Sequence, residues 1–216
     1  TSWRAYEQRV PLGADPVNDP DRLVAAVQGL GRRAAAFEVD LADPAVPDRL
    51  LAEVGDVLGP VGALVLSHAE SVDSGILDTT LDSFDRHFAV NTRAAWLLIR
   101  AFARQVPADG GRIVALTSDH VVGNLPYGAS KGALDRIVIA AARELAPLGI
   151  TANLVNPGPV DTGWMDDETR AALAAHQPTG RLGTPDDAAR LVRFLLADEG
   201  GWISGQLIHS DGGFSV

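Results

Sequence analysis

Residues 110–131 read GGRIVALTSDHVVGNLPYGASK. The stretch opens with a glycine pair and a short apolar run, which predicts a buried β-strand over residues 113–118. The strand ends on two hydroxyl side chains, Thr117 and Ser118. In open α/β sheets, ligands bind at the carboxyl ends of parallel strands. We therefore expect Ser118 to lie at a site, where its hydroxyl can hold a carbonyl oxygen.

The same stretch ends on Lys131, the only lysine of the chain, whose other basic residues are all arginines. On a helix, residues four apart lie on one face, so the Lys131 ammonium can lie near the Tyr127 phenol. A free tyrosine has a pKa of about 10, and a nearby cation lowers it. This pair predicts a tyrosine that acts as a general acid and base. A bare Tyr-x-x-x-Lys pattern also occurs in ordinary amphipathic helices, so the surroundings must decide.

Short apolar runs alternate with helical stretches along the whole chain. We expect strands over residues 35–39, 63–67, 113–118, 151–155 and 206–209. This alternation predicts an α/β fold: a doubly wound parallel sheet, Rossmann-like, in three layers and one domain spanning residues 1–216. A rigid turn, Asn156-Pro157-Gly158, follows the fourth of these strands, and the last helix is predicted to begin at Thr184-Pro185.

These motifs resemble the short-chain dehydrogenase/reductase family, whose members pair a strand-end serine with Tyr-x-x-x-Lys and an Asn-Pro-Gly turn. Asn91 in Ala-Val-Asn-Thr is similar to the family's helix asparagine. The tail over residues 205–213 is similar to the family's last strand and C-terminal turn. The motifs occur in the family's order across essentially the whole chain. They are most similar to the 3-oxoacyl-carrier-protein reductase branch.

The resemblance implies a catalytic set of Ser118, Tyr127, Lys131 and Asn91. Tyr127 would exchange a proton with the substrate oxygen, and Ser118 would orient and polarise the carbonyl. Lys131 would lower the pKa of Tyr127 and hold the ribose hydroxyls of a nicotinamide nucleotide. Asn91 would anchor a water that links Lys131 to solvent; a local helix kink is the alternative explanation of this asparagine.

The resemblance also implies a set of cofactor contacts: Asp40, Leu41, Ser67, Ala69, Tyr127, Lys131, Pro157, Gly158, Val160 and Thr162. Asp40 would contact the adenine, and a solvated carboxylate is an almost equal alternative. Ser67 and Ala69 keep the small side chains that a close cofactor approach requires. His68, between them, is bulkier than the family's residue.

The beginning of the chain departs from the family pattern, because no glycine-rich loop lies between a strand and a helix. Gly29-Leu30-Gly31 follows a helical stretch and predicts a helix end instead. We expect the first strand, the glycine loop and the first helix to lie upstream of Thr1. Arg4 would then be placed to bind a 2′-phosphate, which favours NADP over NAD. An ordinary surface arginine is the alternative, and nearby Glu7 is compatible with NAD.

Residues 159–183 form an excursion that, by resemblance, is a substrate lid. Trp164 and Met165 would offer an apolar surface to a substrate with an apolar portion, although packing alone explains both side chains. The short connection between Ser118 and Tyr127 predicts a trimmed wall of the substrate cleft. His120 in that connection is either a substrate contact or a solvated side chain.

Composition narrows the class of protein. Hydrophobic residues make up 46% of the 216 residues, enough for one core, and no run approaches a membrane span. A net charge of −10 disfavours nucleic acid and anionic membranes as partners. The absence of cysteine excludes thiolate metal sites and is compatible with the cytoplasm, the expected location. We see no metal-ligand cluster in the sequence.

The sequence therefore predicts an NADP-dependent oxidoreductase that acts on a small carbonyl or alcohol substrate. Two alternatives stay open: a noncatalytic subunit of the same fold, and a cofactor-free dehalogenase-like enzyme, a branch that has arginine where this chain has Lys131. By resemblance we expect a homo-oligomer, a dimer or tetramer, that buries Trp96 and Leu97 or their neighbours.

Overall fold

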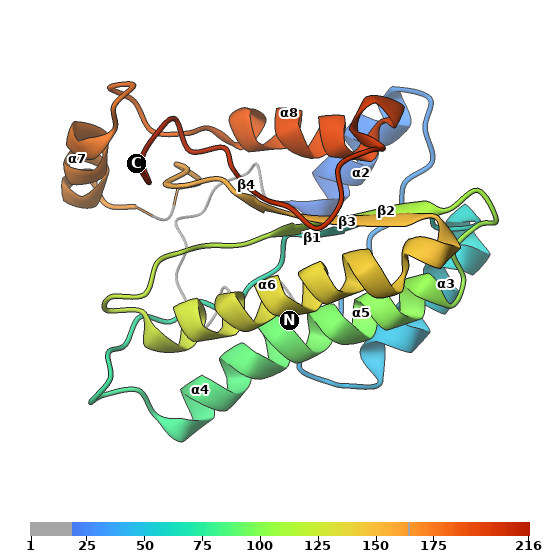
Figure 1. Ribbon diagram of the computed structural model, residues 1–216, viewed down its shortest axis with the longest axis horizontal. Helices are drawn as coiled ribbons and strands as arrows, with labels where there is room; N and C mark the ends of the chain where they lie inside the picture. Colours follow the sequence, from blue (N-terminus) through green and yellow to red (C-terminus); the bar gives the residue numbers. More distant parts are fainter. Residues whose placement is uncertain (1–18, 164) are drawn as a thin grey trace.

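The computed structural model describes residues 19–163 and 165–216 and shows a parallel sheet with helices on both faces (Figure 1). The described strands pair in the order β1-β2-β3-β4, all parallel. Their bounds are β1 Ala63–Leu66, β2 Gly111–Leu116, β3 Ile150–Asn156 and β4 Leu207–His209. The predictions for Arg4, Glu7 and Trp164 concern positions outside the described residues.

Helices on the two sides of the sheet complete three layers (Figure 1). On one side lie α4 (Leu81–His87), the π-helical segment η2 (Phe88–Arg93), α5 (Ala94–Ala103) and α6 (Leu125–Glu144). On the other side lies α8 (Pro185–Leu196). The remaining elements are α2 (Pro20–Gly29), α3 (Val46–Leu58), η3 (Ala146–Leu148), α7 (Asp167–His176) and η4 (Asp198–Gly200). The predicted fold class, a doubly wound α/β sheet, is confirmed.

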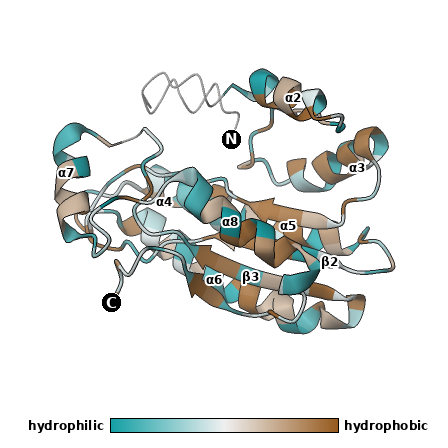
Figure 2. Cartoon of the chain, turned by 90° about the horizontal axis from the view of Figure 1, so that it is seen from above, coloured by the Kyte–Doolittle hydropathy of each residue, from teal (hydrophilic) through white to brown (hydrophobic). Residues whose placement is uncertain are grey.

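Strand β2 shows why the sheet needs both helical layers. Successive strand side chains point to opposite faces. Ile113 and Ala115 join the larger core cluster with α5 and α6, whereas Val114 joins a second cluster with Leu195 of α8. Strand β3 and helix α5 are accordingly coloured mostly as hydrophobic in Figure 2. A strand buried on both faces reads as a continuous apolar run, which is the pattern seen in the sequence.

The strand predicted over residues 35–39 is wrong, because residues 32–40 form no helix or strand. A strand exists only where a neighbour completes its hydrogen-bond ladder, and none of the described strands pairs with this segment. The other four predicted strands are confirmed with shifted ends. Strand β2 ends at Leu116, so Thr117 and Ser118 lie just beyond it.

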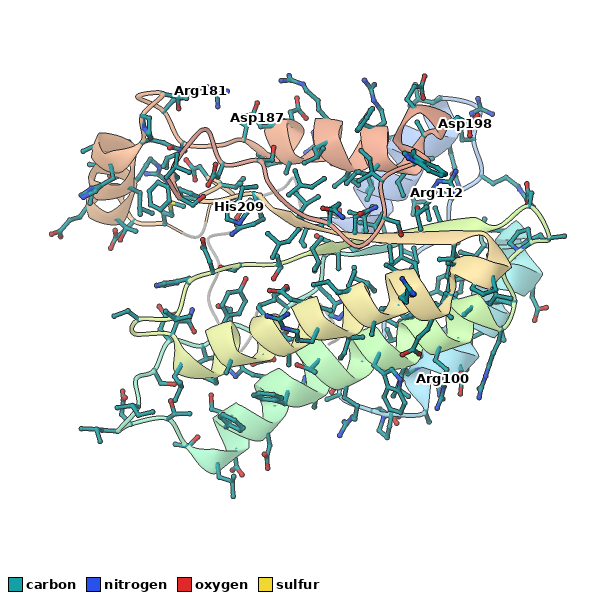
Figure 3. All side chains as sticks on the ribbon, viewed as in Figure 1. Arg100, Arg112, Arg181, Asp187, Asp198 and His209 are labelled. Carbon is teal, nitrogen blue, oxygen red and sulfur yellow. The ribbon has the colours of Figure 1, made fainter. Side chains whose placement is uncertain are left out.

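Two predicted helix ends are confirmed. Helix α2 ends at Gly29, and Gly31 has a φ of 72°, a left-handed conformation that favours glycine. Helix α8 begins after Thr184, whose hydroxyl accepts from the Asp187 N–H while the Asp187 carboxylate accepts from the Thr184 N–H. Arg181 pairs with Asp187 at 2.7 Å (Figure 3). This capping box fixes the end of the preceding excursion.

The two ends of the excursion over residues 159–183 are hydrogen-bonded to each other. The Asp161 N–H donates to the Gly183 carbonyl at 3.0 Å, and the Gly183 N–H donates to the Pro159 carbonyl at 3.1 Å. Within it, Arg170 of α7 pairs with Asp161 at 2.9 Å. Gln177 then donates to the backbone carbonyl of Asp211 in the C-terminal turn. Residues 159–183 are therefore closed off by hydrogen bonds between their two ends and are linked to the segment after β4.

No described helix has the length and apolar character needed to cross a membrane.

Candidate active site

Helix α6 carries Tyr127 and Lys131. Pro126 in its first turn favours helix initiation there, since proline fixes φ and lacks an N–H that would be left unpaired. The Lys131 ammonium lies 5.7 Å from the centroid of the Tyr127 ring. It is 3% exposed and donates to the carbonyl oxygen of Leu116, the last residue of β2, at 2.9 Å. The cation is thus held between the tyrosine and the end of the strand.

Ser118 lies two residues beyond the end of β2 and is half-buried. Its hydroxyl accepts from the His120 N–H at 3.2 Å, which orients the loop that returns to α6. Since β2 pairs in parallel with both β1 and β3, Ser118 lies at the same end of the sheet as the residues that follow those strands, the end where the strands' carboxyl termini meet. His120 itself is exposed.

Burial lowers the pKa of two side chains near this end of the sheet. Burial lowers the pKa of Lys131 to about 8, against an opposing effect of the Asp135 carboxylate. Burial, together with the Lys131 charge, lowers the pKa of His68 to about 4. His68 Nε2 lies 3.1 Å from the Val90 carbonyl oxygen, so the neutral tautomer that carries its proton on Nε2 can donate there. At neutral pH, His68 is therefore neutral and Lys131 is mostly charged.

Asn91 lies in the π-helical segment η2, and such segments are frequent at functional sites. Its side chain is 1% exposed. The amide oxygen accepts from the Glu70 N–H at 2.7 Å, while the amide nitrogen donates to the Glu70 carbonyl and to the Ser130 hydroxyl, each at 2.9 Å. Asn91 thus links the segment after β1 to Ser130 of α6, the residue before Lys131.

Expected cofactor residues follow two strands, β1 and β3, which lie on either side of β2. Ser67 and Ala69 follow β1, and Pro157 and Gly158 follow β3. Gly158 has a φ of 63°, and a Cβ there would lie 2.5 Å from Asp211 Cβ. Val160 forms an isolated bridge with Gly183, and Thr162 is exposed. Small side chains, a glycine turn, an exposed hydroxyl and a buried ammonium fit the nicotinamide half of a dinucleotide.

Asp40, the expected adenine contact, is engaged by Arg86. Both carboxylate oxygens accept from the guanidinium, at 2.9 and 3.0 Å. Burial raises the pKa of Asp40, but Arg86 and the Ala42 N–H outweigh it, so the net pKa is lowered. Arg86 also reaches the buried Glu70 carboxylate at 3.4 Å. Leu41 is 8% exposed and belongs to the larger core cluster, which is a packing role within the chain.

Sequence reasoning missed four side chains at this site: Thr117, Asp135, Glu70 and Arg86. The Thr117 hydroxyl donates to Asp135 at 2.5 Å. Asp135 follows Lys131 by four residues, a spacing that could have indicated it. Glu70 and Arg86 carry no comparable local signal, because their partners lie far away in the chain.

Comparisons with known proteins point to one family. The family model described as enoyl-(acyl carrier protein) reductase matches residues 13–215. An uncharacterised oxidoreductase of Bacillus subtilis (strain 168), YjdA, is 43% identical over 192 residues, covering 86% of this chain and 76% of that protein. A chloroplastic NADPH-dependent aldehyde reductase-like protein of Arabidopsis thaliana is 37% identical, covering 99% of this chain and 82% of that protein.

A solved structure shares the same architecture. The blue fluorescent protein from a metagenomic library, in complex with NADPH, has a TM-score of 0.85 and 33% identity; the match covers 95% of this chain and 85% of that chain. The chain belongs to the short-chain dehydrogenase/reductase family. As a member of that family it is an oxidoreductase that acts on C=O or CH–OH groups.

Proposed function

We propose that this protein transfers a hydride between NADP(H) and a carbonyl or secondary alcohol, with Tyr127 as the general acid and base. The observation that carries the proposal is the buried Lys131 ammonium, 5.7 Å from the Tyr127 ring and linked to the strand end that precedes Ser118. A cation held beside a phenol stabilises the phenolate, which brings the pKa of tyrosine toward the working range of a proton donor.

The chain's residues then divide the work on a carbonyl substrate. The Ser118 hydroxyl donates a hydrogen bond to the carbonyl oxygen and so polarises the carbon. The Tyr127 hydroxyl donates its proton to the same oxygen as charge develops there. When bound, NADPH supplies the hydride. Lys131 stabilises the phenolate left on Tyr127, and Asn91 holds the backbone of α6 next to it through Ser130.

Support for NADP rather than NAD comes from similar proteins and from one sequence position. The Arabidopsis relative is named as NADPH-dependent, and the blue fluorescent protein was solved with NADPH. Arg4 is the residue that we propose to contact a 2′-phosphate. We expect tighter binding of NADPH than of NADH, and Arg4→Ala should reduce that difference.

We propose that residues 159–183 cover the substrate. The hydrogen bonds between its two ends and its link to the C-terminal turn hold this segment in place as one unit. Met165 is 5% exposed, so it packs within the chain, which is the packing alternative to the substrate surface expected from the sequence. A covering segment excludes water from the site, which strengthens the electrostatic effect of Lys131.

Binding and turnover measured on the purified protein test this proposal. Calorimetry should show NADPH binding, and a panel of aliphatic and aromatic aldehydes and ketones should include compounds that cause NADPH oxidation. Failure to bind either nicotinamide nucleotide would favour a noncatalytic subunit. Halide release from haloalcohols without a nucleotide would favour the dehalogenase alternative.

A further inference from the structure

Two side chains of α6 hold consecutive residues at the end of β2. The Lys131 ammonium donates to the Leu116 carbonyl oxygen at 2.9 Å, and the Asp135 carboxylate accepts from the Thr117 hydroxyl at 2.5 Å. Lys131 and Asp135 are four residues apart, so they lie on one face of the helix. The next residue along the chain is Ser118. The two links therefore fix the distance between the strand end and the helix that carries Tyr127.

The charges around Lys131 come from few elements. On α6, Asp135 is half-buried and carries the opposite charge, Arg136 lies next to it, and Tyr127 lies one turn before. From the segment after β1, His68 faces Lys131 and is neutral at neutral pH. The residue that favours the charged form of Lys131 is thus Asp135.

We propose that Asp135 is a positioning residue of this active site: it holds Thr117, and with it Ser118, against α6, and its negative charge keeps the buried Lys131 ammonium protonated. The inference rests on the proposed function, because a protonated Lys131 matters for catalysis only if Tyr127 is the proton donor. Burial raises the pKa of Asp135, and the Thr117 hydroxyl and the Lys131 charge oppose that rise. Thr117 thus helps Asp135 to remain ionised.

Two variants separate the charge of Asp135 from its hydrogen bond. Asp135→Asn removes the charge and keeps an oxygen that can accept from the Thr117 hydroxyl. Thr117→Val removes the hydroxyl and leaves the Asp135 carboxyl group in place. Asp135→Glu keeps the charge on a longer side chain and serves as the conservative variant. Circular dichroism and thermal unfolding show which variants are folded.

The sole lysine makes a direct measurement possible. Residues 1–216 labelled with ¹³C at the lysine ε carbon, and carrying a purification tag without lysine, give one lysine signal, whose chemical shift reports the pKa of Lys131. We expect Asp135→Asn to lower that pKa by about one unit. Thr117→Val and Asp135→Glu should leave it closer to that of the unmodified protein. An unchanged pKa in folded Asp135→Asn overturns the electrostatic part of the proposal.

The same variants have distinct kinetic signatures. With a carbonyl substrate and NADPH, Asp135→Asn should move the alkaline limb of the kcat profile to lower pH. Thr117→Val should lower kcat without moving that limb, because Ser118 is displaced while Lys131 keeps its charge. An equal loss of activity in both variants at every pH would indicate a merely structural role. The lysine titration uses neither substrate nor cofactor, so its result stands even if the proposed reduction is disproved.

Discussion

Gly128 lies so close to the loop before α6 that a Cβ on it would be 2.3 Å from the His120 carbonyl oxygen. The loop and the helix that carries Tyr127 and Lys131 are thus in direct backbone contact. Glycine inside a helix normally costs stability relative to alanine, by roughly 0.5–1 kcal/mol. Here the close approach to the His120 carbonyl oxygen explains the glycine at position 128.

Gly128→Ala should therefore destabilise the protein by about 1–3 kcal/mol, the usual cost of forcing an extra methyl group into a packed site. The matched control is Gly132→Ala, on the same helix, where no described atom other than those of its chain neighbours and the helix's own nearby backbone lies within 4 Å of the added Cβ. That change should stabilise by roughly 0.5–1 kcal/mol. Urea unfolding measures both. Equal effects of the two substitutions would show that the contact with His120 is unimportant.

Asn91→Ala should cost about 2–3 kcal/mol, because it leaves the buried Glu70 N–H and carbonyl without their side-chain partner. Ser130→Ala removes only one of the three Asn91 bonds and should cost about 1 kcal/mol. Denaturant unfolding of both variants and of the double variant gives the coupling between the two residues. Independent, additive losses would contradict the hydrogen-bond network described above.

Lys131 should also make stability depend on pH. The folded protein releases the Lys131 proton near pH 8, whereas an unfolded lysine keeps it to about pH 10. Between these values the unfolded state binds more protons, so the free energy of unfolding rises with pH, and the contribution of Lys131 is smallest below pH 8. Lys131→Met should remove this rise. Stability curves of the two proteins that run parallel from pH 8 to 10 would contradict a lowered pKa.

Trp96 offers a test of self-association. It is 48% exposed and lines a surface groove of about 590 Å³ together with Phe88 and Ile137. The prediction that Leu97 also lies between subunits is not supported, since Leu97 is 6% exposed within a single chain and successive helix residues point in different directions. Light scattering should show an oligomer that Trp96→Glu dissociates. Leu77→Glu, at an exposed apolar position outside the groove, should leave the mass unchanged.

Local sequence patterns predicted the parts of the site that lie close together in the chain. Tyr127 and Lys131 are one helical turn apart, and Ser118 and Pro157 follow apolar strands, so spacing and strand ends indicated their positions, while their roles came from the resemblance to the family. The bidentate pair of Arg86 with Asp40 joins residues 46 positions apart, and no spacing rule indicates it. Strand pairing is equally non-local, which is why residues 35–39, despite their apolar pattern, were wrongly predicted as a strand.

The most direct test of the central claim compares Tyr127→Phe with the unmodified protein in NADPH-dependent reduction of a carbonyl substrate from the panel. The substitution removes the hydroxyl and keeps the ring that lies 5.7 Å from Lys131, so the fold and NADPH affinity should be retained. We predict a fall in kcat of about 10²–10⁴-fold, the usual contribution of a positioned general acid. Undiminished turnover by a folded, NADPH-binding Tyr127→Phe protein would contradict the account.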